Sequence, residues 1–135
     1  MGEGDHAVRG VSHLSLSVTD LARSLEFYRD VVGLPVLVEP FEGAAFSGRE
    51  AMLLAGRVAI ALQAHDSSDG SRFDPLRTGL DHLAFHVSSY AALEDRVAHL
   101  RRSGVECSDP RKVMFGWIVE FRDPDGIQLE FFARA

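Results

Sequence analysis

The fold is decided by a nine-residue stretch that occurs twice, as GVSHLSLSV at residues 10–18 and as GLDHLAFHV at residues 79–87. The two copies share the leading glycine, the histidine in the fourth position, the leucine after it and the final valine. They lie 69 residues apart. Similarity at a fixed offset indicates that one structural unit is used twice.

A helical pattern follows each copy. Apolar residues at helical spacing are Leu21, Leu25, Tyr28 and Val32 after the first copy, and Leu93, Val97 and Leu100 after the second. Gly33 and Gly104 predict where these helices end. The candidate capping residues are Thr19 or Asp20 for the first helix and Ser88 or Ser89 for the second.

Three short runs of β-type composition follow each helix. They span residues 35–39, 44–54 and 57–64 in the first half, and residues 105–107, 117–122 and 127–133 in the second. The sequence therefore predicts an α+β fold of two βαβββ modules, residues 11–64 and 79–135. Residues 1–10 are an expected flexible tail, and residues 65–78 an expected polar linker loop. Because a module of roughly 60 residues buries too little surface alone, the two modules must pair.

Alternation along the predicted strands sorts their side chains into two faces. One face is apolar and is expected to pack against the helices. The other, which we call the cup face, carries mostly small or polar residues. Its predicted members are His13, Ser15, Ser17, Ala59, Ala61, Gln63, His82, Ala84, His86, Gln128, Glu130 and Phe132. His13, His82 and Glu130 therefore all lie on the predicted cup face of their strands.

These three residues are the candidate metal ligands. Two histidines and one carboxylate bind a divalent cation and leave about three octahedral positions open. Substrate oxygens and water fill such positions, and the cation stabilises the negative charge that develops on them. This ligand set does not distinguish Fe, Mn, Ni, Zn and Co, so the expected cofactor is a divalent cation of unspecified identity. A structural role for each residue taken singly is the alternative, and their shared face argues against it.

The chain from about Val11 to Phe132 resembles the vicinal oxygen chelate superfamily, which includes glyoxalase I, extradiol dioxygenases and bleomycin resistance proteins. Residues 11–20, 24–34, 79–87 and 121–132 carry the resemblance. The last segment, FRDPDGIQLEFF, is the most specific, because a DPDG turn leads into a strand with an inward glutamate.

The resemblance implies two paired βαβββ modules whose mixed sheets curl into an open cup around a metal site. It assigns the metal to His13, His82 and Glu130. It also implies a homodimer, because short members of the family often complete each cup with modules from two chains. In that arrangement His13 of one chain joins His82 and Glu130 of the other.

One position departs from the family's pattern. Glu130 in the second module corresponds to Ala61 in the first, where glyoxalase I-like members carry a carboxylate that serves as ligand and base. Gln63, two residues along the same face, is the candidate substitute, and a plain pocket-lining role is its alternative. We assign Glu130 and Gln63 as catalytic residues. Glu120 and His86 are the candidate bases for proton transfer.

The resemblance predicts a metal-dependent lyase or isomerase that chelates a small oxygen-bearing substrate. An extradiol-type Fe(II) dioxygenase is the first alternative, since such enzymes use three protein ligands. A non-catalytic antibiotic-binding protein of the bleomycin-resistance type is the second, and the metal triad argues against it. Arg72 and Arg77 lie in the linker loop, near the expected cup mouth, and receive no site assignment.

Composition narrows the expected partners. The chain has 135 residues, 46% of them hydrophobic, and a formal net charge of −6. Recognition of nucleic acid needs a basic face, which this balance disfavours. No apolar stretch approaches the roughly 20 residues needed to cross a bilayer, and the single cysteine forms no internal disulfide. We expect a cytoplasmic homodimer that binds a small-molecule substrate and neither nucleic acid nor membrane.

Overall fold

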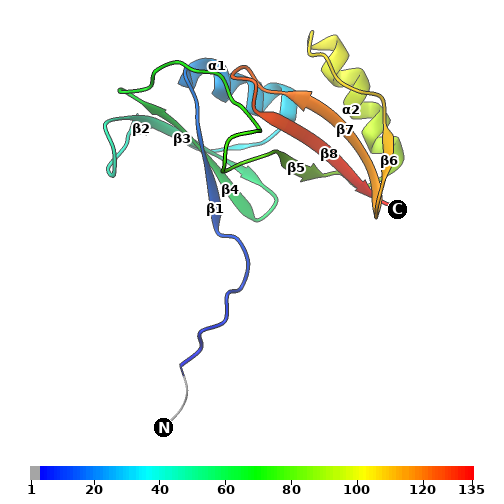
Figure 1. Cartoon of the computed structure of the whole chain (residues 1–135), viewed down its shortest axis with the longest axis horizontal. Helices are drawn as coiled ribbons and strands as arrows, with labels where there is room; N and C mark the ends of the chain where they lie inside the picture. Colours follow the sequence, from blue (N-terminus) through cyan, green and yellow to red (C-terminus); the bar gives the residue numbers. More distant parts are fainter. Residues whose placement is uncertain (1–3) are drawn as a thin grey trace.

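The computed structural model describes residues 4–135, which form two four-stranded mixed sheets and their helices (Figure 1). The strands of the first sheet are β1 (His13–Ser17), β2 (Val36–Glu42), β3 (Gly48–Ala55) and β4 (Val58–His65). Those of the second are β5 (Leu83–His86), β6 (Arg111–Val113), β7 (Gly116–Arg122) and β8 (Gln128–Arg134). The helical segments are α1 (Leu21–Glu26) and η1 (Phe27–Val32) after β1, and α2 (Tyr90–Arg102) after β5. The order βαβββ therefore occurs twice, which confirms the predicted fold class.

Both sheets have the same topology. The strand order is β1-β4-β3-β2 in the first sheet and β5-β8-β7-β6 in the second. The β1–β4 and β5–β8 pairs are parallel, and the remaining pairs are antiparallel. Parallel neighbours require a long crossover connection, which the helix and the two intervening strands supply in each module. The repeat in the sequence is thus a repeat of topology.

The helical segment after β1 changes its winding. Asp20 caps α1, because its side chain accepts a hydrogen bond from Arg23 N at 3.1 Å. From Phe27 the turns widen into the π-helix η1, and Gly33 N donates to Tyr28 O at 3.1 Å. The apolar spacing predicts one uninterrupted α-helix over residues 21–32. The structure differs in its second half, where hydrogen bonds span five residues instead of four.

The second helix matches its prediction closely. Ser89 caps α2 by accepting a hydrogen bond from Ala92 N at 3.1 Å. The three predicted apolar positions, Leu93, Val97 and Leu100, are buried. Among the described residues 4–135, no helix is long and apolar enough to span a membrane.

One strand lies elsewhere than the sequence predicts. In residues 105–107, only Cys107 makes a β-type contact, an isolated bridge to Phe121. The strand that pairs with β7 is β6, Arg111–Val113, in which two of three residues are exposed. A short, polar edge strand has no apolar run, and for this reason the pattern misses it.

Burial follows the two predicted faces in β1, β5 and β8 but not in β4, where the predicted cup-face residue Ala61 is buried along with Ile60 and Leu62. The buried side chains of β1, β5 and β8 are Leu16, Phe85, Leu129, Phe131 and Ala133. The predicted cup-face side chains of β1 and β5 are exposed, and those of β8 are partly exposed. Helix α1 packs on β3 and β4, and α2 packs on β7 and β8. In Figure 1 the helices lie along the upper side of the sheets.

One hydrophobic core joins the two modules. The ring of Phe27 in η1 lies 6.3 Å from that of Phe121 in β7, measured between centroids. Polar contacts cross the same boundary: Thr19 N donates to Asp125 Oδ2 at 3.0 Å. The relative placement of the sheets is therefore fixed by apolar packing and by directional bonds.

Candidate functional site

His82 and Glu130 meet on the cup face of the second sheet. β5 lies parallel to β8, with Leu83 opposite Leu129 and Ala84 opposite Glu130. This register brings His82, one residue before β5, to the side chain of Glu130. His82 Nε2 lies 3.6 Å from Glu130 Oε1. Both residues line a cleft of about 760 Å³.

The separation of these two atoms fits shared coordination of one cation. Imidazole nitrogens and carboxylate oxygens bind first-row divalent metals at about 2.0–2.2 Å. Two such donors on adjacent positions of one ion lie roughly 3–3.5 Å apart. The observed 3.6 Å therefore needs little side-chain movement. The donor set and its spacing fit a divalent metal.

Neighbouring side chains contact His82 on the side of the ring that faces away from Glu130. Asp81 Oδ1 lies 2.8 Å from His82 Nδ1. Gln128 Nε2 donates to the backbone carbonyl of Asp81 at 2.9 Å, and Gln128 Oε1 accepts from Arg122 at 3.1 Å. Two residues of β8, Gln128 and Glu130, thus contact the segment that carries the histidine. The sequence patterns single out neither Asp81 nor Gln128 for this role. The only available signal is that Asp81 directly precedes a candidate ligand.

The electrostatic state of the pair is governed by burial and by Asp81. Burial raises the pKa of the Glu130 carboxyl, although His82 acts to lower it. The hydrogen bond to Asp81 is the main reason why the pKa of His82 is raised. The side chain of Glu130 is 16% exposed, against 44% for His82. His82 therefore offsets only part of the cost of burying a charged Glu130 carboxylate.

His13 lies apart from this pair. It is the first residue of β1 in the other sheet, it is exposed, and its Nδ1 lies 3.0 Å from Ser12 Oγ. Within residues 4–135, no three His, Cys, Asp or Glu side chains come close enough to hold one metal ion. The chain by itself therefore brings together two of the three predicted ligands.

The remaining predicted site residues fall in different surroundings. Gln63 pairs with Ser17 of β1 across the sheet, and its Nε2 donates to Glu50 Oε2 at 3.4 Å. Ala61 is only 2% exposed. On this face of the first sheet, the position that corresponds to Glu130 is therefore covered and carries no ionisable group.

The two candidate bases differ in their distance from the ligand pair. Glu120 lies opposite Glu130 in the β7–β8 ladder, lines the same cleft and forms an ion pair with Arg111. His86 lines a different cavity and packs edge-on against Phe132. Of the two, only Glu120 shares the cleft with His82 and Glu130.

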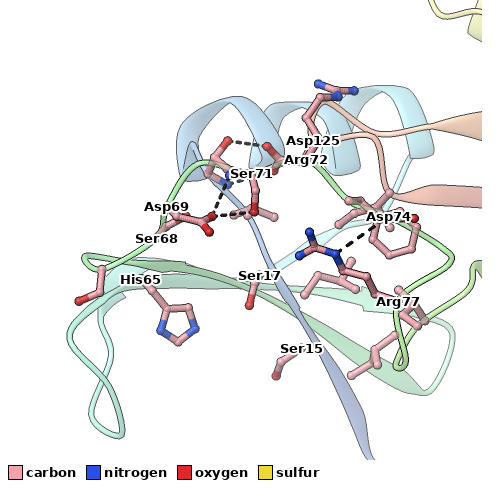
Figure 2. A pocket seen from close by; sticks show the side chains of 18 of the residues that line it. Ser15, Ser17, His65, Ser68, Asp69, Ser71, Arg72, Asp74, Arg77 and Asp125 are labelled. Carbon is pink, nitrogen blue, oxygen red and sulfur yellow. Dashed lines mark hydrogen bonds and ion pairs between the residues drawn. The ribbon is translucent and has the colours of Figure 1, made fainter.

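A further cavity lies between β1 and the linker loop (Figure 2). The cavity measures about 670 Å³, and Ser15, Ser17 and Arg77 are among its lining residues. In Figure 2 the guanidinium of Arg77 lies between the loop and β1, and its Nε is 3.8 Å from Asp74. The acidic and basic side chains that line the cavity are Asp69, Asp74, Asp125, His65, Arg72 and Arg77. With both signs present, the cavity specifies no ligand charge.

Comparison with known proteins identifies the family. The model of the Glyoxalase/Bleomycin resistance protein/Dioxygenase superfamily matches residues 10–131. The chain belongs to this superfamily. The resemblance expected from the repeated histidine strands and the DPDG turn is therefore confirmed. The match runs through both sheets and includes His13, His82 and Glu130.

Two curated proteins and one solved structure are similar to the chain over most of its length. It is 31% identical to the uncharacterized protein YaeR of Escherichia coli (strain K12), covering 93% of this chain and 96% of YaeR. It is 29% identical to the metallothiol transferase FosB of Staphylococcus epidermidis, covering 91% of this chain and 82% of FosB. The crystal structure of a glyoxylase/bleomycin resistance protein/dioxygenase domain from Frankia sp. EAN1pec superposes with a TM-score of 0.86. That alignment has 35% identity and covers 96% of this chain and 100% of the Frankia domain.

Proposed function

We propose that this chain is a metal-dependent enzyme that acts on a small oxygen-bearing molecule. His82 and Glu130 of one chain hold the cation together with His13 of a second copy. The observation that carries the proposal is the 3.6 Å separation of His82 Nε2 and Glu130 Oε1, which both line one cleft. The relative named as a metallothiol transferase supports the metal dependence.

The second copy is part of the proposal because each chain assembles an incomplete ligand set. In the described part of the chain, no third His, Cys, Asp or Glu joins the His82–Glu130 pair. His13 occupies the position in the first module that His82 occupies in the second, and it is exposed on a cup face. Two-fold pairing presents the same surfaces of both copies to each other. A homodimer can therefore build two equal sites, each with two histidines and one carboxylate.

The chemistry follows from the number of protein ligands. When bound, a divalent cation with three such ligands supplies Lewis acidity at its open positions. Glu130 fixes one side of the site. Glu120, which lines the same cleft and lies opposite Glu130 in the β7–β8 ladder, is the proposed proton acceptor. Gln63 supplies an amide on the cup face of the first sheet, where it orients the polar end of a substrate. These roles suit a lyase, an isomerase or, as in FosB, a thiol transferase.

A mixing experiment tests the shared site. His13→Ala and Glu130→Ala proteins are purified separately, mixed under conditions that allow subunit exchange, and assayed for divalent cation binding. Each mixed dimer contains one site with all three ligands. Since a random mixture holds about half mixed dimers, about a quarter of the sites should recover.

His82→Ala mixed with Glu130→Ala is the matched control. Both changes lie in the second module, so every site in the mixed dimer lacks one ligand. Absence of recovery in the first mixture, with exchange demonstrated, would disprove the shared site. Failure of the unaltered protein to bind one cation per chain from a panel of Fe, Mn, Ni, Zn and Co would disprove the metal function itself.

A further inference from the structure

The residue before each predicted metal histidine contacts the same ring nitrogen. Asp81 Oδ1 lies 2.8 Å from His82 Nδ1, and Ser12 Oγ lies 3.0 Å from His13 Nδ1. Positions 12 and 81 are 69 residues apart, as are positions 13 and 82. The two modules therefore repeat a contact as well as a histidine.

The Asp81 contact dictates where the proton of a neutral His82 sits. An ionised carboxylate only accepts hydrogen bonds, so the nitrogen that faces it must carry the hydrogen. The proton is then on Nδ1, and the lone pair is on Nε2. Nε2 is the atom that lies 3.6 Å from Glu130 Oε1. The free lone pair therefore points into the cleft.

The Ser12 contact orients its ring without the same selectivity. A serine hydroxyl both donates and accepts hydrogen bonds, so it satisfies Nδ1 of His13 in either tautomer. The Ser12 Oγ contact still occupies Nδ1 and leaves Nε2 to other partners. The two modules thus share the geometry, but only the second selects a tautomer.

We propose that Asp81 and Ser12 are positioning residues for the two histidines, and that Asp81 holds neutral His82 in the tautomer whose Nε2 binds the cation. This inference rests on the proposed metal function. A partner on the far nitrogen of a ligating imidazole fixes its orientation and raises its basicity, and loss of such a partner lowers metal affinity about 10–100-fold. Gln128 anchors Asp81 through its backbone carbonyl at 2.9 Å, so the carboxylate is left free for His82.

The Asp81 carboxylate is not needed to build the fold. Its side chain is 71% exposed. The hydrogen bond that ties this segment to β8 uses the backbone carbonyl of Asp81, and that carbonyl survives any substitution of the side chain. An Asp81→Ala protein should therefore fold normally, and a change at His82 can be attributed to the lost carboxylate.

The experiment reads the tautomer and the metal affinity separately. Imidazole 15N shifts of His82 are measured in metal-free protein at about pH 9, well above the ordinary histidine pKa of about 6.5, because the neutral ring is needed and the pKa of His82 is raised. We expect the unaltered protein to carry the proton on Nδ1, and Asp81→Ala to redistribute it between the two nitrogens. Divalent cation affinity, measured by calorimetry, should fall about 10–100-fold in Asp81→Ala.

Further variants sharpen the reading. Asp81→Asn keeps an oxygen acceptor without its charge and should give intermediate shifts and affinity. Ser12→Ala should lower the affinity less than Asp81→Ala does. Asp95→Ala, an exposed aspartate on α2, is the control and should change neither quantity.

The outcomes separate this inference from the proposed function. If the unaltered protein binds the cation and Asp81→Ala leaves both tautomer and affinity unchanged, the positioning role is wrong and the metal function stands. If His82 carries its proton on Nδ1 only while Asp81 is present, but no cation binds, the contact is confirmed and the metal function is wrong.

Discussion

The hydroxyl of Tyr28 donates a hydrogen bond to Asp123 Oδ2 at 2.9 Å, and both side chains are buried. Tyr28 belongs to η1 in the first module, and Asp123 opens the DPDG turn before β8 in the second. Asp123 Oδ1 also accepts from the backbone nitrogens of Asp125 at 2.9 Å and Ile127 at 2.8 Å. One carboxylate therefore shapes the turn that leads to Glu130 and ties that turn to the other module.

Tyr28→Phe should destabilise the protein by about 1–3 kcal/mol, because it leaves the buried Asp123 Oδ2 without its donor. Urea unfolding, followed by the change in fluorescence of Trp117, measures this difference. Tyr90→Phe is the matched control, since Tyr90 is 42% exposed and packs its ring on Trp117. It should stay within about 0.5 kcal/mol of the unaltered protein. Equal effects of the two changes would contradict a stabilising role for the Tyr28–Asp123 bond.

Asp123 should make stability fall as pH rises above its unfolded-state pKa. Burial raises the pKa of Asp123 in the folded protein, and this outweighs the three hydrogen bonds that lower it. Between the unfolded value of about 3.9 and the raised folded value, the folded state holds more protons than the unfolded state. The contribution of Asp123 to stability is therefore fully present below about pH 3.9 and is lost as pH rises through the folded pKa.

Asp123→Asn mimics the protonated form and removes this dependence. The difference in unfolding free energy between the unaltered and variant proteins, measured in urea from about pH 4 to pH 7, should decline with rising pH. A difference that grows with pH would show that Tyr28 and the two backbone amides outweigh burial.

Arg96 links α2 to the end of η1. Its guanidinium donates to the carbonyls of Val31 and Val32, the latter at 2.8 Å, and lies 4.4 Å above the centroid of the Phe131 ring. Arg96→Ala should cost about 2–4 kcal/mol, since charged hydrogen bonds contribute about 1.5–3 kcal/mol and a cation–π contact about 0.5–2 kcal/mol. Urea unfolding measures the loss.

Arg102→Ala is the control for Arg96→Ala. Arg102 is the last residue of the same helix and is exposed. Its removal should change the unfolding free energy by less than about 0.5 kcal/mol. A loss at Arg96 no larger than that at Arg102 would mean that the contacts to η1 do not stabilise the packing of the two modules.

The sequence predicts the fold well because its signals are local and periodic. Alternation places Leu16 and Leu129 on buried faces, and the 69-residue offset predicts the repeated topology. The shared predicted face of His82 and Glu130 leads us to expect them close together, and the structure adds the parallel pairing of β5 and β8 that brings them there.

The sequence is silent where a feature has no local signal. β6 has too few apolar residues to be recognised as a strand. The contact of Gln128 with the Asp81 carbonyl joins positions 47 residues apart, and no periodicity links them. Alternation along β1 places His13 on a cup face. Alternation is a property of one strand, so it does not say which copy of the chain supplies the other ligands.

The two glutamines of the chain should separate metal binding from turnover. Gln128 holds the segment of His82 against β8, and Gln63 lies on the cup face of the other sheet. Gln128→Ala should lower divalent cation affinity by about tenfold, as loss of an outer-shell contact does. Gln63→Ala should leave that affinity unchanged and lower kcat, because its proposed contact is with the substrate. Calorimetry with the cation that binds, followed by steady-state kinetics on a substrate turned over by the unaltered protein, measures both quantities. If Gln63→Ala weakened cation binding as strongly as Gln128→Ala, Gln63 would be a metal ligand in place of the carboxylate that is missing at Ala61. Its assignment to the substrate would then be wrong.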